Sequence, residues 1–397
     1  MDSSSLQPPG YFPDEWRRLA FDDFTTLKRG KDLTRDQFRN GRIPVAGSNG
    51  PIGFHDTANV KAPGATVGRS GSVGRVTFYR EDFWAHNTAL FVANFHGNDA
   101  RFAAYFLDSV KLNRFGSGVS VPTLDRNVFR SLPVVVPPLP EQRKIAGVLG
   151  LVQRAMEQQE RLIEKTAELK KTLLHQFFTQ GTRGEPQKQT DLGPVPESWE
   201  VMRVGRFGKV VTGSTPSTKN PEYYNGPYRL VSPADLDTGK YVVSSHRTLT
   251  EAGFAECRGL PKDSVLVGCI GNVGKIGMAP DEWCATNQQI NSVICSKEFN
   301  PHFLYYCLQF HRPRLEQAAA RVTLPILNKS NFENFLVAAP KKAHQDEVAE
   351  ILSVVDEKTA HHRRKHATLS ALFRTLLHQL MTAQLRVHDL DLPELLK

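Results

Sequence analysis

Two stretches of the sequence carry apolar side chains at alternating spacings of three and four residues. This spacing is typical of a coiled-coil seam and predicts two long helices, over residues 141–183 and 343–386. At 1.5 Å per residue, each helix would be a rod of roughly 60 Å. The first seam contains Ile145, Val148, Val152, Ala155, Gln159, Leu162, Thr166, Leu169 and Leu173. The second contains Val348, Ile351, Val355, Lys358, His362, Lys365, Leu369, Leu372 and Leu376.

The rest of the chain has a different pattern. Residues 1–140 and 184–342 are rich in glycine, proline and serine, with short β-branched and aromatic runs such as ATVGRSGSVGRVTFY and SVLVGCIGNVGKIGM. This pattern predicts two compact, strand-rich globules of the α/β (α+β) class. A tail of residues 387–397 follows the second helix.

The two halves are copies of one unit. The five letters TLLHQ occur at residues 172–176 and again at 375–379, 203 positions later. PDEW at 13–16 corresponds to PESW at 196–199, and the glycine segment GSVGR at 71–75 corresponds to GNVGK at 271–275. Because the matches keep their order and the offset grows only in loops, the sequence predicts a tandem duplication with pseudo-two-fold symmetry.

A packing prediction follows from the two seams. The helices would lie antiparallel as a coiled coil, with the globules at opposite ends and the polar pair Gln159 and His362 fixing the register. The alternative is that each helix packs separately on its own globule. Several apolar side chains lie off the seam and would need cover from a partner: Leu149, Met156, Ile163, Leu174, Phe177 and Phe178.

Composition narrows the class of protein. The chain has 397 residues, of which 40% are hydrophobic, as expected for a globular protein. It has no apolar run of the ~20 residues that span a bilayer, and its first residues do not resemble a signal peptide. Five cysteines without CxxC spacing indicate reduced thiols and a cytoplasmic protein. A net charge of +9 weakly favours a polyanionic partner.

Several stretches imitate catalytic motifs but do not fit them. Residues 220–223 and 300–303 lack the second proline of the Asn-Pro-Pro-Tyr/Phe loop of amino-methyltransferases, and 300–303 is predicted to start a helix instead. GCIGNVGK at 268–275 has the wrong spacing for a phosphate loop and predicts a strand-to-strand turn. His362 and His366 lack a third metal ligand. We therefore expect no catalytic residue, cofactor site or metal site.

Polar and basic side chains gather in glycine-rich loops at corresponding places in both halves. Arg and Lys can pair with guanine or phosphate, Asn and Gln with adenine, and Ser and Thr with either. Any single loop of this kind is more often an ordinary loop, but the recurrence of polar residues at the same positions in both halves strengthens the interpretation as a binding surface. The basic run HHRRKH at 361–366 is instead expected to be a solvated helix face. The candidate DNA-binding residues are Lys28, Arg29, Lys31, Ser48, Asn49, Arg69, Ser70, Ser72, Arg75, Arg114, Ser117, Ser214, Thr215, Lys219, Asn220, Asn272, Lys275, Arg321, Thr323 and Lys329.

Over its full length the chain resembles the specificity subunit of type I DNA restriction-modification systems. The resemblance rests on the duplicated layout, the Pro-x-x-Trp start of each unit, the Gly-x-x-Gly-x-Val-Gly turn and, most specifically, PLPEQRKIA, which leads into the first helix. The second copy, PKKAHQDEVAEIL, keeps Pro340 and Gln345 but loses Leu-Pro-Glu.

The resemblance implies a mechanism. Residues 1–140 and 184–342 would be target recognition domains, each reading half of a bipartite, asymmetric double-stranded DNA sequence. The helices would set the spacer and dock two methyltransferase subunits, which use S-adenosylmethionine to methylate adenine N6. Motor-nuclease subunits with ATP and Mg would join for restriction. The base-reading residues of the family vary with the target and do not transfer.

Two other functions remain open from the residues alone. The chain could be a stand-alone methyltransferase or nuclease with an unfamiliar site, which incubation of the purified chain with DNA and cofactor would reveal. It could also be a non-enzymatic nucleic-acid-binding scaffold, which a comparison of duplex DNA with RNA at matched salt would test.

Overall fold

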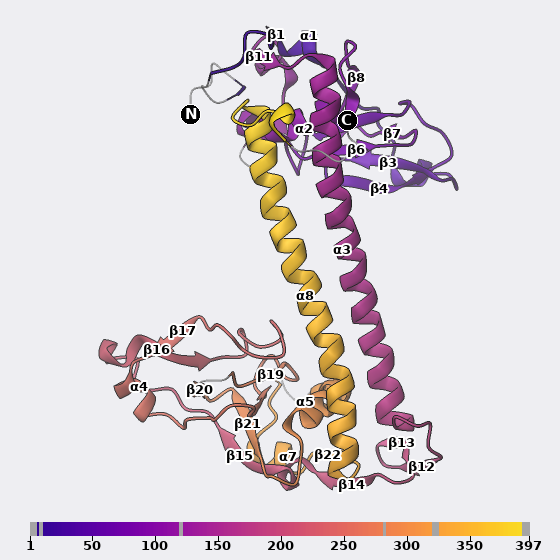
Figure 1. The fold of residues 1–397 in the computed structure, drawn as a ribbon. Coiled ribbons are helices and arrows are strands. Elements are labelled where there is room, and N and C mark those ends of the chain that lie inside the picture. The colour runs from indigo at the N-terminus through magenta and orange to yellow at the C-terminus, as the bar shows by residue number, and fades with distance from the viewer. Residues whose placement is uncertain (1–5, 8–10, 119–121, 281–282, 320–324, 391–397) are drawn as a thin grey trace. The chain divides into compact units, whose positions relative to one another are not determined.

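The computed structural model describes residues 6–7, 11–118, 122–280, 283–319 and 325–390. The chain divides into two compact units: unit 1 is Met1–Gln158 with Lys365–Lys397, and unit 2 is Gln159–Arg364 (Figure 1). Each unit contains one globular part and a portion of both long helices. Sheets and helices occur in both units, which confirms the predicted α/β (α+β) class.

Short strands form the globular part of unit 1: β1 Arg17–Ala20, β2 Thr26–Arg29, β3 Ile43–Gly47, β4 Gly50–His55, β5 Gly64–Gly68, β6 Val76–Tyr79, β7 Trp84–Ala85, β8 Ala89–Asn94, β9 Gly116–Ser117, β10 Thr123–Leu124 and β11 Pro133–Val136. The main sheet has the order β2-β8-β5-β6 and is antiparallel. A second sheet, β4-β3-β7, contains one parallel pair, β3 with β7. The remaining pairs are β1 with β11 and β9 with β10.

Unit 2 repeats this topology with strands β12 Gln187–Thr190, β13 Gly193–Pro196, β14 Glu200–Arg203, β15 Gly208–Thr212, β16 Tyr224–Val231, β17 Arg247–Leu249, β18 Val265–Gly268, β19 Ile276–Met278, β20 Cys284–Thr286, β21 Ile290–Cys295 and β22 Leu336–Ala339. Its main sheet has the order β15-β21-β18-β19, and its second sheet, β17-β16-β20, again contains one parallel pair, β16 with β20. Strand β14 pairs with β22 as β1 does with β11. The hairpin β12–β13 is an addition before the repeat.

One helix packs on the main sheet of each unit, α2 (Ala100–Ser109) in unit 1 and α5 (Pro301–Phe310) in unit 2. Asp99 caps α2, and its side chain accepts hydrogen bonds from the backbone N–H groups of Arg101 and Phe102. Asn300 caps α5 in the same way. The Asn-Pro segment at 300–301 therefore begins a helix, as predicted, because a short polar side chain satisfies the first N–H groups.

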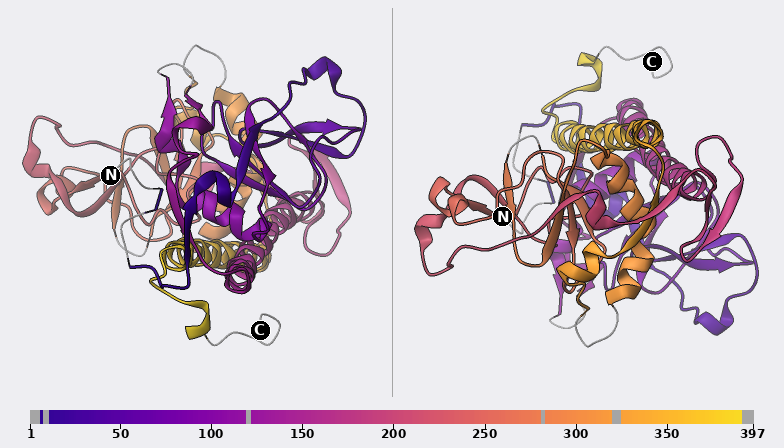
Figure 2. Two further views of the ribbon diagram at one scale, coloured as in Figure 1. Left: turned by 90° about the horizontal axis from the view of Figure 1, so that it is seen from above. Right: turned by 90° about the horizontal axis from the view of Figure 1, so that it is seen from below.

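The two long helices are α3 (Leu139–Gln180) and α8 (Lys342–Met381). Figure 2 views them nearly end-on, one beside the other. Helix α3 stops where Gly181 adopts a left-handed conformation, with φ +68°, and its N–H donates to Phe177 O at 3.0 Å. Such a glycine ends a helix without the steric cost of a Cβ, as its sequence position predicts.

The cores of both units show that the helices pair antiparallel. In unit 1 the start of α3, including Ile145 and Leu149, shares a core with Leu380 near the end of α8. In unit 2 the end of α3, including Phe178, shares a core with Leu352 near the start of α8. Each globular part is thus sealed by the end of one helix and the beginning of the other.

Two expectations about apolar side chains on the helices are wrong. Leu149, Phe177 and Phe178 need no partner subunit to cover them, since all three are buried in the cores of their own units. Leu169 and Leu372 were assigned to the seam, but they are 47% and 44% exposed. The globular parts pack on more of the helix circumference than a two-stranded coiled coil allows, which moves the buried stripe away from the heptad positions.

The repeated Pro-x-x-Trp motif makes the same turn in each unit. The N–H of Trp16 donates to Pro13 O at 2.9 Å, and that of Trp199 donates to Pro196 O at 3.0 Å. Both indole rings are buried, and the Trp16 Nε1 donates to Glu141 at the start of α3. In unit 1 the motif therefore ties β1 to the start of α3, and in unit 2 Trp199 packs against Phe178 near the end of α3.

PLPEQ and PKKAHQ share their last residue, a glutamine in the first turn of each long helix that has the same role in both units. Gln142 Oε1 accepts from the N–H of Asp99 at 3.0 Å, and its Nε2 donates to Pro137 O at 2.9 Å. Gln345 makes the same two bonds, to Asn300 at 3.0 Å and to Pro340 at 2.8 Å. Although the second copy has lost Leu-Pro-Glu, it keeps the side chain that ties the long helix to the globular part.

The shorter helices join these elements. The α-helices are α1 Phe21–Phe24, α4 Glu251–Ala255, α6 Arg312–Ala319 and α7 Lys329–Glu333. The 3-10 helices are η1 Arg35–Gln37, η2 Leu112–Phe115, η3 Arg126–Val128, η4 Val204–Arg206, η5 Pro221–Tyr223 and η6 Val387–Asp389.

Candidate nucleic-acid interface

A tight glycine turn joins β5 to β6 in unit 1. The N–H of Gly68 donates to Arg75 O at 2.8 Å, and the N–H of Gly74 donates back to Gly68 O at 2.8 Å. Gly71 and Gly74 have φ of +84° and +80°, which favours glycine. A Cβ on Gly74 would also lie 2.5 Å from the backbone nitrogen of Asn113. The turn ends on an exposed cation, Arg75.

Unit 2 repeats this turn between β18 and β19. The N–H of Gly268 donates to Lys275 O at 2.8 Å, and the N–H of Gly274 donates to Gly268 O at 3.0 Å. Gly271 and Gly274 again have positive φ, +73° and +83°. The predicted strand-to-strand turn is therefore confirmed, and both copies carry a cation at the same place.

A second segment runs beside the turn in both units. In unit 1 the N–H of Leu124 donates to Arg69 O at 2.8 Å, and in unit 2 the N–H of Leu327 donates to Cys269 O at 2.8 Å. Equivalent bridges accompany these bonds: Ser70 with Thr123, and Ile270 with Ile326. The backbone frame is shared, while the side chains on it differ.

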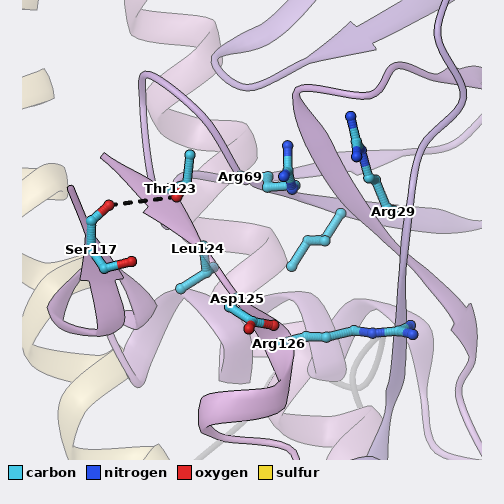
Figure 3. Close-up of a pocket in the computed structure, with 8 residues that line it drawn as sticks. Arg29, Arg69, Ser117, Thr123, Leu124, Asp125 and Arg126 are labelled. Carbon is cyan, nitrogen blue, oxygen red and sulfur yellow. Dashed lines mark hydrogen bonds between the residues drawn. The ribbon is translucent and has the colours of Figure 1, made fainter. Parts of the chain in front are cut away.

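This frame encloses a polar cavity of about 500 Å³ in unit 1 (Figure 3). Arg29 reaches it from the end of β2, Arg69 from the glycine turn, and Arg126 from the start of η3. Three guanidinium groups and the carboxylate of Asp125 thus surround one opening. The other lining residues are Leu90, Ser117, Thr123 and Leu124.

Local hydrogen bonds position these side chains. Arg126 Nη1 donates to Leu27 O, and Arg69 Nη1 lies 3.5 Å from Asn87 O. Asp125 Oδ1 accepts from the N–H of Asn127 at 2.9 Å, which caps η3. Within the described residues, no ion pair joins Asp125 to any of the three arginines, two of which donate to backbone carbonyls.

The glycine turn of unit 2 lines a smaller cavity of about 280 Å³. Asn272 and Lys275 contribute from the turn, and Arg312 contributes from α6. Arg312 is already paired, with Asp237 at 3.0 Å and with Glu316 at 3.0 Å. Lys275 is therefore the cation of this cavity that has no recorded ion pair among the described residues.

The structure places the other predicted residues of unit 1 in varied surroundings. Lys28 is exposed on β2, Lys31 follows that strand, and Ser48 and Asn49 form the β3–β4 hairpin turn. Ser70 and Ser72 belong to the glycine turn. Arg114 donates to Leu6 O at 2.9 Å, which gives it a structural contact.

In unit 2, several predicted residues bind neighbouring protein groups. Thr215 Oγ1 donates to Gln288 at 2.9 Å, and Ser214 accepts from the N–H of Arg258 at 3.3 Å. Asn220 caps η5, and exposed Lys219 precedes it. Lys329 lies 3.5 Å from Glu333. Arg321 and Thr323 lie outside the described residues.

Sequence reasoning missed Thr123, Asp125 and Arg126 in unit 1 and Arg312 in unit 2. The first three lie within two residues of Leu124, and the repeated spacing Leu-x-x-x-x-Phe at 124–129 and 327–332 could have marked that segment as part of the duplicated frame. Arg312 is the first residue of α6 and carried no such signal.

Three of the five thiols do not offer a reactive or metal-binding alternative. Burial raises the pKa of Cys269 to about 11 and the pKa values of Cys284 and Cys295 to about 12. These cysteines are therefore neutral, and a thiolate is needed for nucleophilic attack or metal binding. Among the described residues, no group of three His, Cys, Asp or Glu side chains could hold a metal ion. No described helix is long and apolar enough to cross a membrane.

These features define a class of protein: two copies of one module, each carrying a differently lined polar site beside the same glycine turn. The model of the type I restriction modification DNA specificity domain matches residues 13–165 and again 196–371. The chain belongs to this family, and the double match confirms the predicted tandem duplication. Its part in such a system is DNA recognition and not catalysis.

Individual relatives agree with this assignment. The chain is 28% identical over 191 residues to the specificity subunit of the type I restriction enzyme MjaIX from Methanocaldococcus jannaschii, covering 47% of the chain and 44% of that relative. It is 21% identical over 331 residues to the putative MjaX specificity subunit of the same organism, covering 79% and 76%. The HindI specificity subunit of Haemophilus influenzae is 28% identical over 210 residues, covering 51% and 42%.

Solved structures share the fold. The type I restriction-modification S subunit from M. genitalium superimposes with a TM-score of 0.68 at 17% identity, covering 92% of this chain and 96% of that one. A chain from a structure of type I restriction-modification complex assembly and conformational transition gives a TM-score of 0.54 at 14% identity, covering 95% and 100%.

Proposed function

We propose that this chain is the DNA-recognition subunit of a type I restriction-modification complex and that each globular part reads one half of a bipartite, asymmetric target. Residues 1–140 and 184–342 are the two target recognition domains, and the long helices set the spacer between the half-sites. The role belongs to the chain as a whole, since one target recognition domain would read only half of the target.

The observation that carries the proposal is the contrast between frame and side chains in the two units. Both glycine turns present a cation, Arg75 or Lys275, on the same hydrogen-bonded loop. The neighbouring positions differ, with Arg69 in unit 1 and Cys269 in unit 2. A shared frame suits the phosphate backbone, which is common to all DNA, and different side chains suit two different half-sites.

The long helices offer equivalent positions for two partner subunits. Unit 1 exposes Leu151 (45%) and Leu372 (44%), and unit 2 exposes Val354 (45%) and Leu169 (47%). Each residue of one unit matches a residue of the other at an offset of 203 (354 − 151 and 372 − 169). Exposed large apolar side chains at symmetric places favour two copies of one partner, which we propose to be methyltransferase subunits.

The cofactors follow from these partners. The methyltransferase subunits bring S-adenosylmethionine and methylate adenine N6, and motor-nuclease subunits bring ATP and Mg when the complex restricts DNA. The chain itself binds none of these cofactors, and the complex works in the cytoplasm.

Sequencing of methylated adenines tests the proposal directly. Cells that produce the chain with its methyltransferase partner should carry methylation at one split motif, and cells that lack the chain should lose it. Methylation that is unsplit, or that persists without the chain, would contradict the proposal.

A further inference from the structure

In both units the segment beside the glycine turn contains a buried leucine, and the residue after that leucine occupies the same place in the repeat. Asp125 follows Leu124, and Asn328 follows Leu327, at the same offset of 203. Both side chains are exposed. Both also cap a short helix: Asp125 Oδ1 accepts from the N–H of Asn127 at 2.9 Å, and Asn328 Oδ1 accepts from the N–H of Asn331 at 2.8 Å. The two residues therefore hold equivalent positions along the chain, each at the N-cap of a short helix.

We propose that Asp125 and Asn328 are specificity-determining residues, which read a base amino group in one half-site and a base acceptor in the other. This inference rests on the proposed function, and it assigns the hydrogen-bonding chemistry of one position in each half-site.

The chemistry follows from the atom that each cap leaves free. Because Oδ1 is used by the cap, Asp125 presents Oδ2, which can only accept, and Asn328 presents Nδ2, which can only donate. In the major groove, an acceptor matches the amino group of cytosine N4 or adenine N6. A donor matches guanine O6 or N7, adenine N7, or thymine O4.

A comparison of the charged residues in the two units distinguishes contacts to bases from contacts to phosphates. The residue after each cap keeps its positive charge, Arg126 in unit 1 and Lys329 in unit 2, as do Arg75 and Lys275 in the turns. A phosphate is met by both units, so a retained cation suits it. A carboxylate repels phosphate, so Asp125 at the mouth of an arginine-lined cavity favours a base amino group instead.

At two further positions, as at the capping residue, the chemistry of the side chain differs between the two units. Arg29 lies directly before Gly30, which corresponds to Gly213, so its equivalent is Thr212. Arg69 corresponds to Cys269, which is buried. The cavity in unit 1 therefore combines an acceptor with two unit-specific guanidinium donors. Such a set can read a G·C pair, with an arginine on guanine and Asp125 on cytosine N4.

The test uses substitutions that keep the cap. Asn and Asp serve almost equally well as N-caps, so Asp125→Asn and Asn328→Asp should leave the fold intact. Asp125→Ser, which also caps, provides a second variant. Asp99→Asn is a matched control, because it makes the same change in charge at the N-cap of α2, where Asn300 is the natural equivalent in unit 2.

Each full-length variant would be purified in complex with its methyltransferase subunits and mixed with a DNA library that is randomised over both half-sites. Sequencing of the bound DNA would give the base preference at each position. We expect Asp125→Asn to change base preference at one position of one half-site by about fivefold to tenfold. Asn328→Asp should do the same in the other half-site only. Asp99→Asn should change neither.

Two outcomes would overturn the inference separately from the proposed function. If the wild-type complex reads a split site but Asp125→Asn and Asp125→Ser keep every base preference, Asp125 only caps its helix. If Asp125→Asn alters affinity equally for all sequences, its carboxylate acts on phosphates through its charge. If the wild-type complex reads no split site, the proposed function itself fails.

Discussion

His362 Nδ1 lies 2.9 Å from Gln159 Oε1, which joins the middle of α8 to the middle of α3 by one hydrogen bond. Gln159 is only 4% exposed. A buried polar pair between two helices penalises every shifted register in which one partner stays buried without the other, so we propose that this bond sets the register of the helices.

We expect Gln159→Ala to lower the free energy of unfolding by about 1–2 kcal/mol, because it removes the partner of a half-buried imidazole. His362→Ala should cost a similar amount. If the two residues act as a pair, a double-mutant cycle from urea unfolding should give a coupling of about 0.5–1.5 kcal/mol. Strictly additive effects would show that the contact does not contribute to stability.

The glycine turn of unit 1 provides a prediction with an internal control. Gly74 and Gly97 have nearly the same φ, +80° and +78°, but a Cβ on Gly74 would lie 2.5 Å from the Asn113 nitrogen and one on Gly97 would meet nothing within 4 Å. Gly97→Ala should cost about 1 kcal/mol of stability and Gly74→Ala about 2–3 kcal/mol or more. Thermal unfolding measures both. Equal costs would mean that the backbone of the turn relaxes freely.

A pH dependence is expected from His311 at the end of α5. Burial and, to a smaller extent, the neighbouring Arg314 lower its pKa to about 3. In the unfolded chain this imidazole takes up a proton near pH 6.5, whereas in the folded chain it stays neutral at that pH. Its effect on the free energy of unfolding is therefore fully favourable above about pH 6.5 and is lost progressively as the pH falls toward 3. Unit 2 should be about 2 kcal/mol less stable at pH 5 than at pH 7.5 from this group.

The equivalent position in unit 1 supplies the control variant. Val110 follows α2 as His311 follows α5, and both N–H groups close the last turn of their helices. His311→Val should remove this part of the acid sensitivity, and Arg314 would still donate to Leu336 O. Hydrogen exchange of the α5 amides at both pH values is the measurement. If the loss of protection between pH 7.5 and pH 5 is the same in His311→Val as in the wild type, the acid sensitivity belongs to other groups.

How far the sequence could lead is clearest at particular residues. The repeat placed Gln159 opposite His362 because both interrupt an apolar seam in equivalent polar positions. The repeat could not predict that Leu169 is exposed and Phe178 is buried. The heptad pattern describes only contacts with the partner helix, whereas the globular parts pack on other faces of the helices. Asp125 was missed because a capping residue between two repeated apolar positions has no chemical signature of its own until the fold brings it beside Arg29 and Arg69.

The cations at the glycine turns give a prediction about DNA affinity. Arg75→Ala and Lys275→Ala should each weaken binding to all sequences and reduce the salt slope of log K by about one unit, because each removes one phosphate contact. Lys61→Ala is the control, since Lys61 is paired with Asp82 at 2.7 Å and lies outside the turn. A loss of preference at one base pair without a change in slope would instead place these side chains on bases.

The last prediction concerns the spacing of the two half-sites. If α3 and α8 determine the distance between the reading domains, inserting four residues into each helix, next to Gln159 and His362, should change the spacer. Each helix would lengthen by about 6 Å at 1.5 Å per residue. DNA advances about 34 Å per ten base pairs, so the spacer should grow by one or two base pairs. Four residues are slightly more than one helical turn, so the contacts between the helices stay roughly in phase.

Both half-sites should keep their sequences, because the globular parts are untouched. Sequencing of methylated adenines in cells with the variant and its methyltransferase partner would measure spacer and half-sites together. An unaltered spacer would show that the helices do not set the distance, and altered half-sites would show that the globular parts are not the only readers.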